Sequence, residues 1–406
     1  MEVFCTSPWV PPEWIKAHGL EPRGVWLAKD FACEPLSLSA GVCAFANAAV
    51  RLAERQSQAA VIFTTHCDQL RRGFDTVAVP PMSLDSPESC RRFSLSPSEG
   101  ERAGVRGPTL PRGSEAQYAS HGRGVLPRIF LFNLPVTWQT LVAERIFCDE
   151  LRRLGEFLIS LGGHPPATEE LAEIMDYYSQ ARRCLLAAVS WCPARAYAEA
   201  VAQFHLDGSV RLPERGCPQP QQSRRGRQGE LSDRLAVTEP AAVGDSRAPG
   251  TGFIPLALVG GPLPQSQLPV LDAIEQAGGR VVLNATEAGE RSLWSRSSLD
   301  QAQPVAGAPA QPGAALPTLL ARNCLANCVD VFQRPNTRLY DWLRVRLTAR
   351  KARGIILWHY VGCDLWRAEA QPMREAFGLP VLLLDADEAA PRRNTGRLEA
   401  FLESLR

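Results

Sequence analysis

The chain has 406 residues, 45% of them hydrophobic and 21% charged, and a formal net charge of +1 at pH 7. This composition is typical of a soluble globular protein, and the length is sufficient for two domains. The near-zero charge gives no support for a nucleic-acid partner, and no run of about 18 apolar residues supports a membrane span.

Residues 1–8 lack the basic and apolar regions of a secretory signal peptide. We therefore expect a cytoplasmic protein whose 12 cysteines are mostly reduced thiols. Metal binding is the most informative function that reduced cysteines can have in the cytoplasm.

Short apolar runs alternate with amphipathic segments along the chain. In the first half we expect strands at 24–32, 59–63 and 128–135, and helices at 43–56, from 69, at 140–162, at 168–191 and from 193. In the second half we expect strands at 254–260, 280–284, 354–361 and 379–384, and helices at 267–277, 318–331, 337–353, 372–377 and 397–405.

Two long stretches have no apolar period. Residues 83–126 are rich in Ser, Pro, Gly, Glu and Arg, which predicts disorder. Residues 211–250 are again of low complexity, dominated by Pro, Gln, Arg, Gly and Ser, and 301–316 is loop-like. The rest predicts an α/β protein with parallel sheets and helices on both faces. We expect an N-terminal lobe at 1–210, a linker at 211–250 and a C-terminal lobe at 251–406.

Three cysteines share one sequence context. Cys67 and Cys363 each follow a predicted strand and precede an aspartate, and Cys43 opens a predicted helix. Ligands of open α/β sheets lie at the carboxyl ends of the strands, so two sheets facing each other at those ends would bring the thiols together. Thiolates select soft metals and iron–sulfur clusters, and three of them on a [4Fe–4S] cluster leave one iron open. Burial as small core residues is the alternative.

Several stretches resemble the D-component of 2-hydroxyacyl-CoA dehydratases, the family of 2-hydroxyglutaryl-CoA dehydratase and benzoyl-CoA reductase subunits. They are GVCAFA at 41–46, FTTHCDQLRR at 63–72, IFLFNLP at 129–135, GGRVV at 278–282 and the segment 354–384 with Cys363-Asp364. Their order and spacing carry the resemblance. One departure is Ala44, because the family commonly has proline after its first cluster cysteine.

The resemblance implies two Rossmann-like or flavodoxin-like lobes with a [4Fe–4S] cluster held by Cys43, Cys67 and Cys363. It also implies an acyl-CoA substrate, an ATP-dependent activator that injects one electron, and a homologous partner subunit or a homodimer. The electron would produce a ketyl radical that expels the hydroxyl group; in the reductase branch an aromatic ring is reduced instead. A non-catalytic iron–sulfur electron-transfer subunit and a degenerate relative without a cluster remain alternatives.

Other side chains have both a functional and a structural interpretation. His66 and His359 are candidate proton donors to the leaving hydroxyl, or they pack at strand ends. Arg71 and Arg72 would meet CoA phosphates or form a solvated helix face. Asp68 and Asp364 would cap helices or tune the cluster, and the remaining cysteines on predicted helices (148, 184, 192, 324 and 328) are expected in the core. No nucleotide-binding glycine motif is present, so neither NAD nor ATP is expected.

Overall fold

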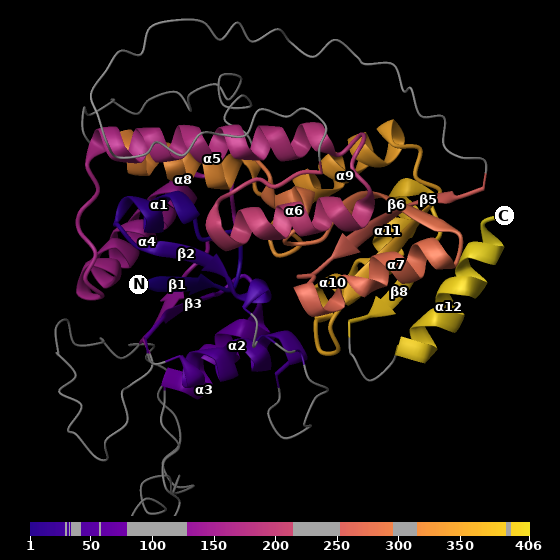
Figure 1. Cartoon of the computed structure of the whole chain (residues 1–406), viewed down its shortest axis with the longest axis horizontal. Coiled ribbons are helices and arrows are strands. Elements are labelled where there is room, and N and C mark those ends of the chain that lie inside the picture. The colour runs from indigo at the N-terminus through magenta and orange to yellow at the C-terminus, as the bar shows by residue number, and fades with distance from the viewer. Residues whose placement is uncertain are drawn as a thin grey trace, which may run out of the picture.

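The structure is a computed structural model that describes residues 1–28, 31, 33, 42–56, 58–78, 128–213, 252–294, 315–386 and 391–406. The predicted disordered segment 83–126, all but three residues of the predicted linker 211–250, and residues 301–314 of the predicted loop lie outside these residues. Figure 1 shows the arrangement of the elements described below.

Two four-stranded parallel sheets confirm the predicted α/β fold. In each sheet the second strand in sequence lies at one edge, followed by the first, third and fourth, in the orders β2-β1-β3-β4 and β6-β5-β7-β8. The strands of the first sheet are β1 (Glu2–Cys5), β2 (Glu21–Gly24), β3 (Ala60–Thr64) and β4 (Arg128–Phe132). Those of the second are β5 (Ile254–Gly260), β6 (Gly279–Ala285), β7 (Gly354–His359) and β8 (Val381–Asp385).

The helices connect these strands and cover both faces of each sheet, as parallel pairing requires. In the first half they are α1 (Pro12–Ala17), η1 (Val25–Leu27), α2 (Ala44–Arg55), α3 (Asp68–Ala78), α4 (Leu141–Ser160), α5 (Thr168–Ala188) and α6 (Ala194–Asp207). In the second half they are η3 (Gln265–Gln267), α7 (Pro269–Gln276), η4 (Glu290–Ser292), α8 (Ala315–Asn327), α9 (Thr337–Ala349), α10 (Asp364–Ala368), α11 (Ala370–Phe377) and α12 (Pro391–Ser404).

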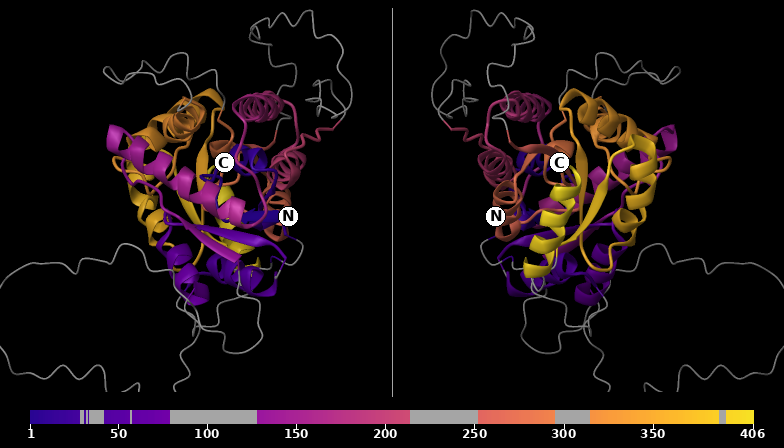
Figure 2. Two further views of the ribbon diagram at one scale, coloured as in Figure 1. Left: turned by 90° about the vertical axis from the view of Figure 1, so that its left-hand side faces the viewer. Right: turned by 90° about the vertical axis from the view of Figure 1, so that its right-hand side faces the viewer.

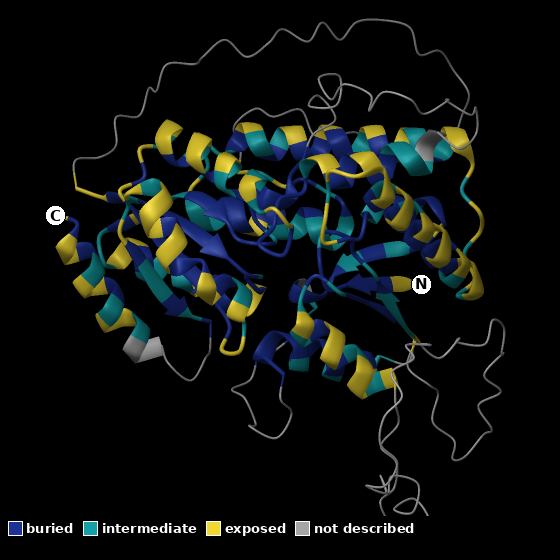
Figure 3. Ribbon diagram, turned by 180° about the vertical axis from the view of Figure 1, so that it is seen from behind, coloured by how far each residue is buried: buried dark blue, intermediate teal, exposed yellow. Residues whose placement is uncertain are grey.

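Alternate side chains of the strands pack into different cores. In the first sheet, Phe63 of β3 packs with α2 and α3, whereas its neighbour Ile62 packs with α1, α4 and α8. In the second sheet, Ile356 of β7 faces α7 and α12, and Ile355 faces α9 and α11. The central strands β3 and β7 are accordingly buried throughout, while the outer helices alternate between buried and exposed residues (Figure 3).

The two halves of the chain share their cores. Helix α8 comes from the second half but packs against α4, with Leu320 and Cys324 in the core behind the first sheet. Another core runs from α2 to α7 and α12, across both sheets. Figures 1 and 2 agree that α2 and α3 lie along one edge of the molecule and α5 and α8 along the opposite edge, with the sheets between them.

The predicted first strand at 24–32 is wrong. The chain forms β2 at 21–24 and then turns into η1, and the first strand is β1 at the amino terminus, followed by α1. Pro22 lies within β2, which obscures a strand pattern in the sequence, but β2 is an edge strand, where a missing N–H is tolerated. Within the described part of the chain, none of the helices combines the length and apolar content needed to cross a membrane.

Candidate functional site

Cys43, Cys67 and Cys363 line one pocket. They come from three separate segments: Cys43 is the N-cap of α2, Cys67 directly precedes α3, and Cys363 is the N-cap of α10. All three are free thiols, with Cys43 buried and the other two partly buried. The pocket leaves ≈ 490 Å³ free of protein atoms, including space open to solvent.

The fold explains how two of these cysteines meet. Cys67 follows β3 and Cys363 follows β7, which are the third strands of two sheets with the same strand order. Each lies a few residues beyond the carboxyl end of a central strand, where ligands of parallel sheets bind. Cys43 is joined to the site by Gln69 of α3, whose Oε1 accepts a hydrogen bond from the Cys43 backbone N–H at 2.7 Å.

Helix N–H groups surround the three sulfurs. The N–H of Ala46 donates to Cys43 Sγ at 3.4 Å, Cys67 interacts with the N–H groups of Gln69 and Leu70, and Cys363 with that of Trp366. Unpaired N–H groups and the positive end of a helix stabilise negative charge on a thiolate. The three helix starts therefore favour an anionic group between them.

Burial opposes that charge when no cation is present. It raises the pKa of Cys43, despite the N–H groups that lower it, and raises the pKa of Cys363 to about 12. The pKa of Cys67 lies well above its ordinary value, first because of burial and then because Cys43 and Cys363 lie nearby. Three thiols with raised pKa values become thiolates readily only when a positively charged centre binds them.

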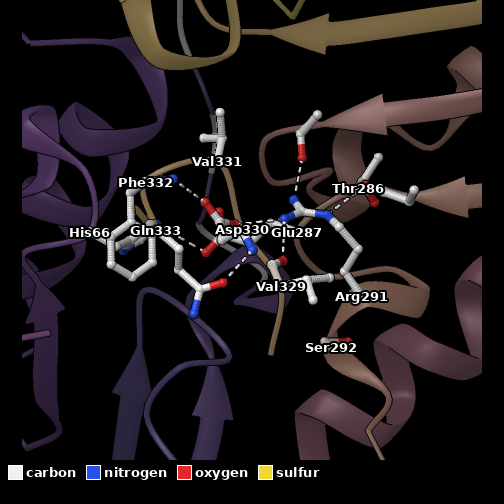
Figure 4. Close-up of polar contacts among 12 residues, drawn as sticks. His66, Thr286, Glu287, Arg291, Ser292, Val329, Asp330, Val331, Phe332 and Gln333 are labelled. Atoms are coloured by element: carbon white, nitrogen blue, oxygen red, sulfur yellow. Dashed lines mark hydrogen bonds and ion pairs between the residues drawn. The ribbon is translucent and has the colours of Figure 1, made fainter. Parts of the chain in front are cut away.

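A buried polar wall lines the same pocket as the thiols. Figure 4 shows polar contacts of its members His66, Glu287 and Asp330. His66 Nε2 is 3.2 Å from Glu287 Oε1, and the same oxygen accepts a hydrogen bond from Ser7 Oγ at 2.6 Å. His66 Nδ1 is 2.8 Å from Thr64 Oγ1. Ser7 and His66 belong to the first half of the chain and Glu287 to the second, so this network ties the halves together at the pocket.

The two ionisable groups of this network stabilise each other's charge. Burial lowers the pKa of His66, but the charge of Glu287, its hydrogen bond and the charge of Asp330 outweigh burial, so the pKa is raised. Burial raises the pKa of Glu287, but His66, Ser7 and Arg291 outweigh it, and the pKa is lowered. Each group therefore favours the charged form of the other, a buried imidazolium beside a buried carboxylate.

Arg291 neutralises the second carboxylate of the wall. Its Nη1 donates to Asp330 Oδ2 at 2.6 Å and to Val329 O at 2.9 Å, and its guanidinium lies 4.7 Å from the centre of the Trp366 ring. Its other nitrogens donate to the carbonyls of Ala285 and Gly260. The arginine thereby fixes the strand ends and α10 beside the pocket.

The remaining predicted residues lie elsewhere. His359 does not line the pocket: its Nε2 is 3.1 Å from Asp385 Oδ1 at the end of β8, and its Nδ1 is 3.2 Å from Tyr360 O. Arg71 and Arg72 are more than half exposed and pair with Asp68 on the surface of α3.

The cysteines expected in the core differ in burial. Cys324 and Cys328 are buried in the core shared by α4 and α8. Cys148, Cys184 and Cys192 are only partly buried, and they pack at the edges of the helical cores.

Glu287, Asp330 and Tyr360 line the pocket but were not predicted from the sequence. Neither was Arg291, which does not line the pocket but pairs with Asp330. Two of them carried a usable signal, because Glu287 follows β6 and Tyr360 follows β7 at the same sheet edge as Cys363. Asp330 and Arg291 had none, because Asp330 follows a helix and Arg291 lies in a short turn. Their roles depend on a tertiary pairing between them.

The donor set fits an iron–sulfur cluster. Thiolate is the ligand such clusters prefer, and three thiols in one pocket, each with helix N–H groups at its sulfur, are present. Among the described residues no three His, Cys, Asp or Glu side chains are arranged to hold a single metal ion. A polynuclear cluster differs from that case, because each thiolate binds its own iron and the sulfurs need not meet at one point.

Comparison with known proteins bears on this site. The family model described as 2-hydroxyglutaryl-CoA dehydratase, D-component, matches residues 234–405, a span that includes the second sheet and Cys363. The match confirms the resemblance inferred from the sequence, and it suggests a 2-hydroxyacyl-CoA dehydratase-like subunit. None of the curated proteins matches the chain.

Proposed function

We propose that this chain, a relative of the 2-hydroxyglutaryl-CoA dehydratase D-component through residues 234–405, is an iron–sulfur subunit that acts on a 2-hydroxyacyl-CoA. The observation that carries the proposal is the convergence of Cys43, Cys67 and Cys363 in one pocket. Two of these cysteines lie outside the matched span, so the pocket supports the proposal independently of the family match.

The three thiolates would hold a [4Fe–4S] cluster. When bound, such a cluster supplies one-electron chemistry and an iron with an open ligand position that can act as a Lewis acid. The helix N–H groups at the sulfurs would stabilise its negative charge, as they do for other anions. The apolar side chains of Phe45, Leu70 and Trp366 line the same pocket and would limit the access of water.

The chemical outcome would be loss of water from the acyl-CoA. An ATP-hydrolysing activator protein would supply one electron, which would reduce the thioester carbonyl to a ketyl radical that expels the hydroxyl group from C2. Loss of a proton from C3 and return of the electron would then complete the elimination of water. The family description as a component implies further subunits, so we expect a homologous partner or a second copy of this chain in the active assembly.

His66 is the side chain that we assign as proton donor to the departing hydroxyl. It lines the pocket beside Cys67, and Glu287 favours its protonated form. Donation would require the imidazole to exchange its contact with Glu287 or Thr64 for one with the substrate, because both ring nitrogens already have partners. His359 is paired with Asp385 away from the pocket, and we assign it to packing at the end of β7.

The contacts of His66 with Glu287 and Thr64 favour a second candidate function. If the imidazole cannot leave its partners, the chain lacks an available acid in the pocket and would serve as a non-catalytic iron–sulfur electron-transfer subunit. Binding of a 2-hydroxyacyl-CoA to the purified protein, measured by calorimetry, separates the two candidates. Binding supports the catalytic function, and its absence supports electron transfer.

Iron analysis tests the cluster. Protein purified without oxygen and reconstituted with iron and sulfide should hold about four irons per chain and show the broad visible absorption of an iron–sulfur protein. Cys67→Ser and Cys363→Ser should each lose most of the iron. Cys192→Ser, the same change at a partly buried thiol outside the pocket, should retain it. Equal iron in all four proteins would refute the assignment.

A further inference from the structure

A second pocket lies next to the first one. It is bordered by the segments that follow β1 and β2, by α5 and α6, and by η4, and leaves ≈ 430 Å³ free of protein atoms, including space open to solvent. Ser7 lines it and donates its hydroxyl hydrogen to Glu287, which lines the pocket of the three cysteines. One hydrogen bond therefore connects the walls of the two pockets.

Two buried donors in the walls of the second pocket have no partner. The indole Nε1 of Trp26 and the Nε of Arg182 make no hydrogen bond, although both residues are only 2% exposed. A buried N–H without an acceptor costs roughly 1–3 kcal/mol of folding free energy, so two such N–H groups in one pocket are uncommon. Trp26 and Arg182 both line the pocket, and an oxygen acceptor bound there would satisfy them.

His205 offers a hydrogen-bond acceptor to the same pocket. Its Nε2 is 2.9 Å from Ser292 Oγ, and that hydroxyl already donates to Gly289 O at 2.6 Å. The hydroxyl has one hydrogen, so the imidazole must donate through Nε2. Burial and then the charge of Arg182 lower the pKa of His205 to about 3, so the ring is neutral and Nδ1 is an acceptor. His205 also lines the pocket and packs edge-on against Trp26, with 5.4 Å between ring centres.

The charges around the pocket are already balanced. Arg182 Nη1 lies 2.5 Å from Glu13 Oε1 in a fully buried pair, and Arg23 Nε lies 3.0 Å from Glu2 Oε1. An additional ionised group would enter a buried site with no free countercharge, which is unfavourable. An uncharged ligand that carries both hydrogen-bond acceptors and donors fits better, and the amide group has that combination.

We propose that the second pocket binds the amide-bearing pantetheine arm of the acyl-CoA. This inference rests on the proposed function, since it names the part of the same substrate that this pocket would hold. The carbonyl oxygens of the arm would accept from Trp26 and Arg182, and an amide N–H would donate to His205. Tyr178 and Phe204, which also line the pocket, would contact its methylene groups. To reach the pocket of the three cysteines, the thioester end would displace the buried Ser7 from its hydrogen bond to Glu287.

The test uses S-acetylpantetheine and acetyl-CoA, which have no free thiol to bind iron, and the full-length reconstituted protein. Affinity is measured by calorimetry for the wild type and for Trp26→Phe, which removes the indole N–H and keeps an aromatic ring. Trp138→Phe is the matched control, because Trp138 is partly buried outside the pocket and its indole donates to Pro335 O at 3.0 Å. The indole N–H resonance that Trp26→Phe removes from the NMR spectrum identifies Trp26.

The expected result is that both probes bind the wild type and shift the Trp26 indole resonance. Trp26→Phe should bind S-acetylpantetheine about five- to tenfold more weakly, the loss of one hydrogen bond, and Trp138→Phe should bind it like the wild type. If acetyl-CoA binds but Trp26→Phe does not weaken either probe, the pantetheine site is wrong and the proposed function stands. If neither probe binds the wild type while iron is retained, the acyl-CoA function itself is contradicted.

Discussion

Replacing Glu287 by glutamine tests the buried ion pair that joins the two halves of the chain. The change keeps the size of the side chain and an oxygen that accepts from Ser7, but removes the charge that faces His66. Both side chains of the pair are only 6% exposed, so solvent cannot replace the lost interaction.

The loss of unfolding free energy caused by Glu287→Gln should depend on pH. The raised pKa of His66 means that its contribution to stability is complete below its unfolded value of 6.5 and is lost as pH rises through the folded value. The lowered pKa of Glu287 means that its contribution is complete above its unfolded value of 4.5 and is lost as pH falls through the folded value. Between these two unfolded values, at pH 5.5, the pair is at full strength.

The magnitude follows from the type of interaction. At pH 5.5, Glu287→Gln leaves an imidazolium without its anion, and a hydrogen bond to a charged group contributes about 1.5–3 kcal/mol, so we expect a loss of about 2 kcal/mol. At pH 8.5, well above the unfolded pKa of His66, less of the imidazole is protonated and glutamine still accepts from the neutral ring, so the loss should be smaller than at pH 5.5.

Thermal and urea unfolding of iron-free protein at the two pH values measures the difference. The control is Glu369→Gln, a buried glutamate whose oxygens accept from Asn336 and Tyr340 and contact no histidine. Its cost should not fall in the same way between pH 5.5 and pH 8.5. A Glu287→Gln cost that is equal at both pH values, or larger at pH 8.5, would refute the ion-pair reasoning.

Two further changes test the packing around the sheets. Gly260→Ala should prevent soluble folding, because the added Cβ would lie 1.9 Å from Trp358 O at a φ of +147°. Gly378→Ala, at a φ of +64° with nothing within 4 Å, should lower the free energy of unfolding in urea by only about 1 kcal/mol. Similar losses of stability in the two variants would contradict this reasoning. Leu154→Ala, in the fully buried face of α4, should lower the free energy of unfolding in urea by about 2–5 kcal/mol. Ile159→Ala should lower it much less, because Ile159 is 42% exposed on the same helix. The reverse order would contradict the burial pattern.

Most of the fold was predictable because its strands are short apolar runs between amphipathic helices. β5 was predicted at its observed bounds, and α2 and α9 were predicted to begin within a residue of their observed starts. The pattern failed at the amino terminus, where β1 has only four residues and β2 contains Pro22. A strand that short has too few residues to establish an apolar period.

The residues of the candidate site that could best be predicted from the sequence are those that closely follow a strand. Cys67 and Cys363 occupy corresponding places after the third strand of each sheet, and a position after a strand can be recognised locally. The second pocket was not predictable, because Trp26, Arg182 and His205 come from three helical segments whose packing has no local signature. The packing of α8 beside α4 is a tertiary contact of the same kind.

The central claim is that three thiols from separate segments hold one polynuclear iron centre with an open position. Mössbauer spectroscopy of protein reconstituted with isotope-enriched iron tests it most directly. One iron site should have parameters distinct from those of the three thiolate-bound irons, and that site alone should change when a 2-hydroxyacyl-CoA is added. Four equivalent thiolate-bound irons, or iron bound only as isolated ions, would contradict it.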